Sequence, residues 1–310
     1  MPPTGKYAIH GDFKSIRVMN IKFSPLIIAL LNLVIRVTRI LRKRSRDVSV
    51  THYTIAGEDG HRVGVRVMTP NNARPAAPAL VYYHGGGFAL TFASLHLENA
   101  ERYARETGCI VVFACYRLAM KHPFPDGFDD CYAALNWVVE NAARLGVDRT
   151  RIAVGGDSAG GALAAGVAQK CRDEQLTRLC GQLLIYPVLD HRCSTKSATD
   201  FVDVPVWNAI SNRRMWAMYL KCVTAVDLPA YAAPGLGDAN GLPRTYIETA
   251  EFDPLRDEGL NYAKRLAACG NSPTLNETCG TIHGYDAIAK NEIAIASMQK
   301  RIVFLKSAFA

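Results

Sequence analysis

The sequence predicts an α/β fold in which a mostly parallel central sheet carries helices on both faces. The composition, 49% hydrophobic and 21% charged over 310 residues, is that of an ordinary globular protein. Short apolar runs recur along the chain, and stretches with a mostly helical pattern separate them, as the crossovers between parallel strands require. The six runs span residues 79–83, 110–114, 152–155, 182–186, 245–249 and 274–278.

The first segment of the chain, residues 1–47, is strongly basic, with ten Lys or Arg against two Asp or Glu. The rest of the chain carries 26 charges of each sign, which argues against a nucleic-acid partner. The apolar run 26–35 is too short, and too closely followed by arginines, to span a bilayer. It predicts an amphipathic helix that packs on its own protein, and the alternative is contact with an anionic membrane surface. The polar stripe of this helix holds Asn32, Arg36, Arg39 and Lys43.

A change of pattern at residue 48 marks the start of one large domain, which we place at residues 48–310. Residues 48–56 and 61–68 are β-rich, and Glu58-Asp59-Gly60 between them is a hairpin turn signal. The alternating strands and helices follow. Ligands of such sheets bind beyond the carboxyl ends of the strands, so the residues at those ends are the informative ones.

The nine cysteines are scattered and odd in number, and none forms a Cys-x-x-Cys pair. They are typical of reduced thiols in a cytoplasmic protein, and the first residues lack the layout of a secretion signal. The densest group of metal-ligand residue types, Asp190-His191 with Cys193, has no second pair at a recognised spacing. We therefore expect no metal and no other cofactor.

A glycine-rich turn follows the strand at 152–155 and precedes a run of small helical residues. It reads Gly156-Asp-Ser158-Ala159-Gly160, a Gly-x-Ser-x-Gly turn. Such a turn holds the serine hydroxyl exposed in a strained backbone, with a helix N-terminus behind it that favours developing negative charge. Ser158 is the candidate nucleophile.

Three consecutive glycines follow the strand at 79–83 in His84-Gly85-Gly86-Gly87-Phe88. Glycines leave the backbone free to turn several N–H groups toward one point, as a developing oxyanion requires. We expect the donors to be the amides of Gly85 and Gly86, with that of Ala159 as the third. His84 is expected to brace the loop rather than to act as a base.

A base and an orienting acid should follow two later strands. Asp253, before Pro254, stands at the end of the strand at 245–249, whereas Asp257 lies a turn into the next helix. The loop after residues 274–278 delivers His283. The chain order Ser158, Asp253, His283 on successive strand ends is the α/β-hydrolase order and predicts a catalytic triad.

These motifs together resemble the hormone-sensitive lipase family of bacterial-type esterases over residues 48–310. The resemblance implies an α/β-hydrolase that cleaves carboxylic esters, usually with short acyl chains, without a cofactor, and it again selects Asp253 as the triad acid. The motifs that carry it are His84-Gly-Gly-Gly-Phe88, Tyr116-Arg-Leu-Ala119 with Phe124-Pro125, Gly156-Asp-Ser-Ala-Gly-Gly161, Asp253-Pro-Leu-Arg-Asp-Glu-Gly259 and His283-Gly284.

The family builds a helical cap from its N-terminal helices and an insertion, which implies a cap here from residues 1–47 and from about 190–225. Its aromatic residues would face the acyl pocket, which is expected to include Phe88, Phe92, Trp207 and Trp216. Where the family commonly has two carboxylates and a proline, this chain has Cys115, Met120 and Lys121, so the charges near the nucleophile are expected to differ.

The expected substrate is a small-molecule ester of short to medium acyl chain, handled by a monomer or homodimer. An amide or formamide hydrolase would use the same triad and remains an alternative. A non-catalytic small-molecule receptor on this fold, like the plant gibberellin receptors, is disfavoured because such a receptor would be expected to lack the base that His283 supplies.

Overall fold

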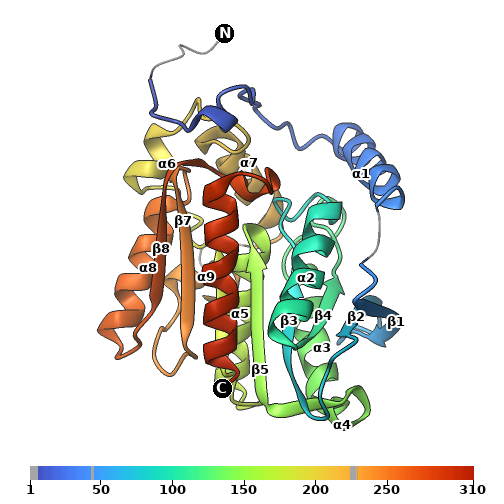
Figure 1. Ribbon diagram of the computed structural model, residues 1–310. Coiled ribbons are helices and arrows are strands. Elements are labelled where there is room, and N and C mark those ends of the chain that lie inside the picture. The colour runs from blue at the N-terminus through green and yellow to red at the C-terminus, as the bar shows by residue number, and fades with distance from the viewer. Residues whose placement is uncertain (1–5, 43–44, 224–227, 229) are drawn as a thin grey trace.

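A computed structural model of the protein describes residues 6–42, 45–223, 228 and 230–310, and its centre is a single eight-stranded sheet (Figure 1). The strand order is β1-β2-β4-β3-β5-β6-β7-β8. Strands β3 to β8 run parallel, and the hairpin β1–β2 adds to the edge at β4 antiparallel. The strands are β1 (Val48–Ala56), β2 (Arg62–Pro70), β3 (Ala77–Tyr83), β4 (Ile110–Cys115), β5 (Val147–Asp157), β6 (Gly181–Ile185), β7 (Thr245–Phe252) and β8 (Thr274–Ile282).

The predicted α/β fold is confirmed, and each of the six predicted apolar runs coincides with a parallel strand. The ends differ most at β5, which begins five residues before the predicted run and continues to Asp157. The polar start of this strand, Asp148 to Arg151, is partly exposed and has no apolar pattern to reveal it. The predicted hairpin is present, with Gly60 in the left-handed region at a φ of 76°.

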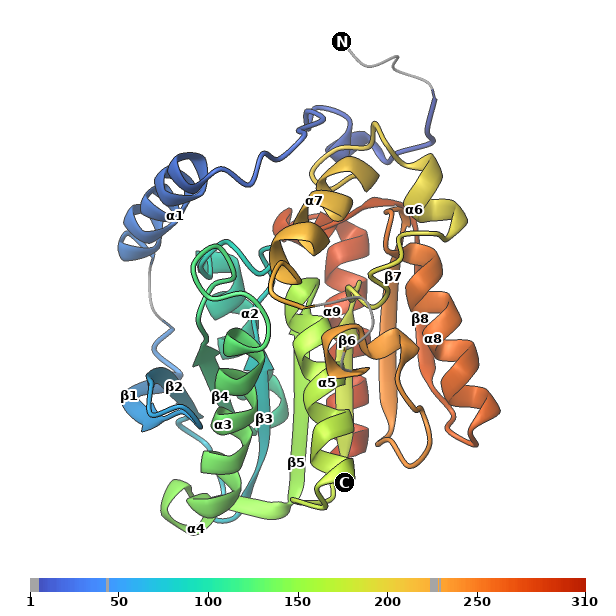
Figure 2. The ribbon, with the colours of Figure 1, turned by 180° about the vertical axis from the view of Figure 1, so that it is seen from behind.

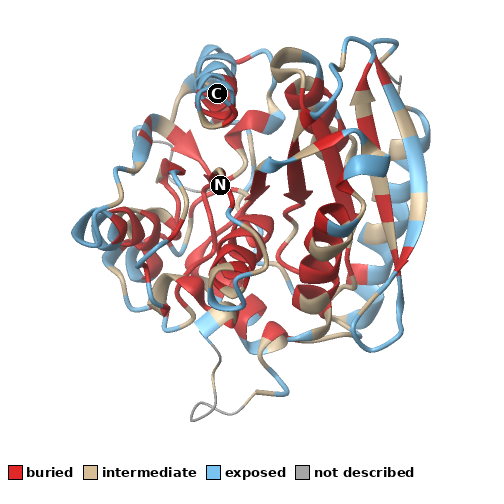
Figure 3. Ribbon diagram, turned by 90° about the horizontal axis from the view of Figure 1, so that it is seen from below, coloured by how far each residue is buried: buried red, intermediate tan, exposed pale blue. Residues whose placement is uncertain are grey.

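Helices cover both faces of the sheet. Helices α2 (Ser94–Thr107) and α9 (Glu292–Ala308) pack on one face, and α3 (Asp126–Glu140), α5 (Ala159–Asp173) and α8 (Arg256–Ala268) pack on the other (Figures 1 and 2). Buried residues gather in the central strands and the inward sides of these helices (Figure 3). The short α4 (Ala142–Leu145) leads into β5. Because β3, β5, β7 and β8 are parallel, the loops that follow them leave one edge of the sheet.

The segment between β6 and β7 contains α6 (Lys196–Asp200) and α7 (Ala209–Tyr219), which lie above that edge (Figure 2). The extended residues 6–24 run across them. The Ile21 amide donates to Ser211 Oγ at 3.0 Å, and Asn208 Nδ2 donates to the carbonyl of Met19 at 3.1 Å. The extended part of the N-terminal segment therefore contacts the inserted helices.

Helix α1 (Pro25–Ile40) lies apart from α6 and α7, over the start of α2 (Figures 1 and 2). The helix packs on its own protein, as predicted. The expectation that its apolar side faces inward is wrong, because Asn32 and Arg39 face the body and most of the aliphatic residues face outward. Lys43 of the predicted stripe lies outside the described residues. None of the helices in the described part of the chain has the length and apolar character needed to cross a bilayer.

A buried ion network holds the loop after β8 against the sheet. Arg301 of α9 is fully buried and pairs with Glu248 of β7 and, at 2.8 Å, with Asp286 of that loop. Tyr186 donates to Asp286 at 2.7 Å, and its ring packs edge-on against His283 with centroids 4.7 Å apart. The network thus ties α9 to the position of the histidine.

We expect Arg301→Met to lower the free energy of unfolding by about 3–5 kcal/mol, because two carboxylates would stay buried without their cation. Urea unfolding at neutral pH measures this. Lys196→Met, which breaks the exposed pair between Lys196 and Asp200, is the control and should cost less than about 1 kcal/mol. Equal losses in the two variants would contradict the role given to the network.

Candidate active site

Ser158 stands at the turn between β5 and α5 with φ 54° and ψ −119°, a strained conformation for a residue with a side chain. Backbone hydrogen bonds impose it. The Ser158 amide donates to the carbonyl of Ile185 at 2.8 Å, and its own carbonyl accepts from the amide of Val188 at 3.1 Å. The tight turn therefore fixes the direction of the Ser158 side chain.

The glycines that flank Ser158 permit a close approach of two chain segments. A Cβ at Gly156 would collide with the carbonyl of Gly160, and a Cβ at Gly160 would collide with the carbonyl of Tyr83 at the end of β3. Any side chain at these positions would push α5 away from the sheet. This is the physical reason for the Gly-x-Ser-x-Gly spacing in this chain.

His283 lies between Ser158 and Asp253. Its Nε2 is 2.9 Å from Ser158 Oγ, and its Nδ1 is 2.7 Å from Asp253 Oδ2. Asp253 is fully buried, and its Oδ1 accepts from the amide of Leu255 at 2.9 Å. The three side chains come from loops after β5, β7 and β8, so the structure brings the three predicted residues together in hydrogen-bonding order.

The competing carboxylate, Asp257, points elsewhere. Its Oδ2 accepts from the amide of Ser197 at 2.8 Å, which anchors the start of α6. This leaves Asp253 as the carboxylate paired with the histidine.

His84 braces the glycine loop, as predicted. Its Nδ1 donates to the carbonyl of Gly85 at 2.7 Å, and its ring stacks on Tyr116 with centroids 4.4 Å apart. Burial, together with the neighbouring His96, lowers the pKa of His84 to about 3. The imidazole is therefore neutral in the folded protein at neutral pH.

A depressed folded-state pKa for His84 makes stability depend on pH, because the unfolded chain takes up a proton near the ordinary pKa of ~6.5 and the folded chain does not. The stability is fully present above about pH 6.5 and is lost as the pH falls toward 3. Relative to His84→Phe, the wild type should lose up to about 1.4 kcal/mol of unfolding free energy per pH unit between about pH 6 and 4. Urea unfolding across this range measures the difference. The same pH dependence in His84→Phe and in the wild type would contradict a neutral, buried His84.

The backbone amides of the glycine loop differ in their hydrogen-bond partners, and one of the predicted oxyanion donors, Gly85, is not supported. The N–H of Gly85 donates to Asp157 Oδ2 at 3.1 Å, so it is already engaged. Among the described residues, the N–H groups of Gly86 and Gly87 have no acceptor. The N–H of Ala159, the first residue of α5, has no intrahelical partner because of its position. The sequence did not single out the free amide of Gly87, since nothing in three consecutive glycines shows which N–H is already engaged.

Asp157 is the carboxylate that orders this loop. Besides the Gly85 amide, it accepts from the Tyr82 hydroxyl at 2.8 Å and lies 3.2 Å from His96 Nε2. Burial alone would raise its pKa, but these partners, His96 foremost, lower it to about 2. The carboxylate is thus ionised and holds Gly85 in place next to the nucleophile.

Aromatic side chains surround the His283 ring and the glycine loop. The ring of Trp207 lies 6.0 Å from that of His283, and a Cβ at Gly87 would lie 3.0 Å from Trp207 Cη2. The indole N–H groups of Trp207 and Trp216 are buried and have no partner within the described residues. Phe88 stacks on Tyr219 of α7, with centroids 3.8 Å apart. These contacts place Trp207 beside the triad, while Phe88 and Trp216 join α7 to the loop.

Phe92 does not accompany them. Its ring packs edge-on against Phe113, and the Arg39 guanidinium of α1 lies over it at 3.8 Å. Cys115 and Lys121 also line the groove between α1 and the body. We therefore place Phe92 and the residues that depart from the family pattern beside this groove rather than beside Ser158.

Asp190 belongs to the short stretch in which metal-ligand residue types are densest in the sequence. Its carboxylate forms a local ion pair with Arg192 at 2.6 Å. The described residues contain no group of three or more His, Cys, Asp or Glu that could hold a metal ion.

Comparison with known proteins agrees with this geometry. A family model described as the alpha/beta hydrolase fold matches residues 80–287. The chain belongs to the α/β-hydrolase fold family. Carboxylesterase NlhH of Mycobacterium tuberculosis H37Rv is 44% identical to it over 242 residues, which are 77% of this chain and 76% of the relative. Esterase LipI of the same organism is 35% identical, over 77% and 75% of the two chains.

Solved structures show the same likeness. Bacterial heroin esterase superimposes with a TM-score of 0.89 at 37% identity, covering 94% of this chain and 95% of that one. Esterase LipW from Mycobacterium marinum gives 0.89 at 34% identity, covering 97% and 96%. This α/β-hydrolase is a carboxylic ester hydrolase, and the resemblance to the hormone-sensitive lipase family is confirmed.

Proposed function

We propose that the protein hydrolyses esters of short to medium acyl chain through an acyl-enzyme on Ser158. The observation that carries the proposal is the hydrogen-bonded series from Asp253 through His283 to Ser158, with heavy-atom distances of 2.7 and 2.9 Å. Both distances lie within hydrogen-bond reach, and the 2.9 Å contact lets His283 take the proton of Ser158 directly.

In the first half of the proposed reaction, His283 Nε2 accepts the proton of Ser158 as Oγ forms a bond to the ester carbonyl carbon. The amides of Gly86, Gly87 and Ala159 are the proposed donors to the oxyanion. Collapse of the tetrahedral intermediate breaks the C–O bond to the alcohol, whose oxygen takes the proton back from His283.

In the second half, His283 takes a proton from water, whose oxygen attacks the acyl carbon. Breaking the bond to Ser158 Oγ releases the acid, and the proton returns to the serine. Asp253 is ascribed a constant role, holding the proton of His283 on Nδ1 so that Nε2 is free to accept. No cofactor is needed for any step.

The acyl preference is supported by two observations. The large rings of Trp207 and Phe88 occupy space close to the glycine loop. A relative from Pseudomonas putida, 33% identical over 76% of this chain, is named ethyl acetate hydrolase. The amide-hydrolase alternative has no observation of this kind in its favour.

A panel of p-nitrophenyl esters of increasing acyl length, measured beside the matching p-nitroanilides, tests the proposal. We expect kcat/KM to be highest for acyl chains of up to about eight carbons and at least about 100-fold lower for each anilide, because an amide carbonyl is less electrophilic than an ester carbonyl and an amine is the poorer leaving group. An anilide turned over as fast as its ester would favour the amide hydrolase.

We also propose that the protein works in the cytoplasm as a monomer or homodimer on small-molecule esters. All nine cysteines are free thiols, and Cys109, Cys131, Cys171 and Cys193 among them are buried, which suits a reducing compartment.

A further inference from the structure

The outer face of α1 is the largest gathering of exposed aliphatic side chains in the described part of the protein. Nine of the fourteen exposed large hydrophobic residues lie between residues 26 and 41. At 100° per residue, the most exposed of them share one side of the helix. The nine are Leu26, Ile27, Leu30, Leu31, Leu33, Val34, Val37, Ile40 and Leu41. Solvated apolar surface of this extent marks a contact surface.

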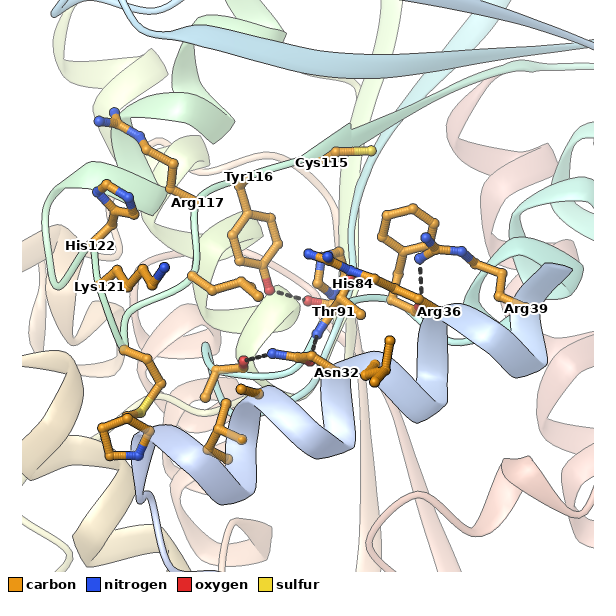
Figure 4. A pocket seen from close by; sticks show the side chains of 18 of the residues that line it. Asn32, Arg36, Arg39, His84, Thr91, Cys115, Tyr116, Arg117, Lys121 and His122 are labelled. Carbon is orange, nitrogen blue, oxygen red and sulfur yellow. Dashed lines mark hydrogen bonds between the residues drawn. The ribbon is translucent and has the colours of Figure 1, made fainter.

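The exposure of this face is fixed by polar contacts on the opposite side of the helix. Both polar atoms of the Asn32 side chain are hydrogen-bonded, since Nδ2 donates to the carbonyl of Ala89 at 3.0 Å and Oδ1 accepts from the amide of Thr91 at 2.7 Å (Figure 4). Arg39 donates to the carbonyl of Phe92 at 2.9 Å, and Arg42 pairs with the buried Glu101. Turning the aliphatic face inward would break all of these contacts.

The segment that carries this face is strongly basic. Residues 14–46 contain nine Lys or Arg and no Asp or Glu. Lys22 just before α1, Arg36 within it and Arg46 after it are exposed. A second copy of the chain would bring like charges together at this surface, whereas an anionic surface would be attracted to it.

We propose that the outer face of α1 docks on an anionic lipid surface, with its aliphatic side chains in the hydrocarbon boundary and its flanking cations at the head groups. A helix of 16 residues is about 24 Å long and would lie in the plane of the surface. Its inner face binds residues 89–92, directly after the glycine loop, and α1 lies toward the same end of the molecule as α6 and α7 (Figures 1 and 2). Docking would therefore bring the candidate active site close to esters dissolved in the lipid.

Co-sedimentation of the full chain with vesicles tests the proposal. The probes are phosphatidylcholine vesicles alone and vesicles with about 30% phosphatidylglycerol. The test variant is Leu30→Ser with Val37→Ser, and the matched control is Ile295→Ser with Val303→Ser on α9, whose side chains are similarly exposed. Circular dichroism verifies that both variants are folded.

We expect the wild type to bind the anionic vesicles, and to bind phosphatidylcholine vesicles at least about tenfold more weakly. The α1 variant should bind the anionic vesicles at least about tenfold more weakly than the wild type, and the α9 control should bind them like the wild type. High salt should weaken the binding to anionic vesicles. Three results would each overturn the proposal: no binding to anionic vesicles, equal losses in both variants, or a dimer in size-exclusion chromatography that only the α1 variant dissociates. Binding does not depend on hydrolysis, so Ser158→Ala should bind like wild type, and failure here leaves the proposed esterase mechanism intact.

Discussion

Ser158→Ala is expected to lower kcat on a p-nitrophenyl ester by about 10⁶-fold, the scale seen when a triad nucleophile is removed. The loss follows from the geometry, because Oγ, 2.9 Å from His283 Nε2, is the atom that the base activates to form the acyl bond. The melting temperature should stay within about 3 °C of wild type, since the substitution removes a single atom and alanine keeps the Cβ in the same turn.

Covalent labelling separates a lost nucleophile from a damaged fold. A serine-directed phosphonate should add one label to the wild type, detectable by mass spectrometry, and none to Ser158→Ala. Labelling of the variant at wild-type rate, or a substantial share of the activity retained, would show that the nucleophile is another residue.

The fold and the proximity of Ser158, Asp253 and His283 could be predicted because their signals are local and repeated. Each parallel strand carries an apolar run. The residues that follow β5, β7 and β8 include Ser158, Asp253 and His283, in the chain order of the α/β-hydrolase triad. The tight packing of Gly156 and Gly160 against neighbouring backbone also has a sequence signature, since no other residue fits.

The orientation of α1 could not be predicted, because periodicity shows that a helix has two faces but not which one meets the protein. The deciding contacts of Asn32 are with backbone groups of residues 89 and 91, which carry no sequence signal. The engagement of the Gly85 amide is hidden for the same reason. It depends on the direction of the Asp157 carboxylate, which is set by the tertiary structure and has no local sequence signal.

Replacing Asp253 by Asn tests the acid of the triad and should lower kcat/KM by up to about 10⁴-fold. The expected cause is the wrong tautomer of His283. Asp253 Oδ1 accepts from the Leu255 amide at 2.9 Å, so the oxygen of an asparagine would stay there and its NH₂ group would face His283. Nδ1 would then have to accept, the imidazole proton would move to Nε2, and Nε2 could not take the proton of Ser158.

Asp257→Asn is the matched control, since it makes the same chemical change four residues later. Its oxygen can still accept from the Ser197 amide, so we expect less than about a threefold change in kcat/KM, with any effect confined to the stability of α6. Both variants are compared at saturating and limiting p-nitrophenyl acetate, and the loss in Asp253→Asn should lie mainly in kcat, because proton transfer and not substrate binding is impaired. If Asp257→Asn were the crippling change and Asp253→Asn nearly silent, the 2.7 Å contact between Asp253 and His283 would not be the one that catalysis uses.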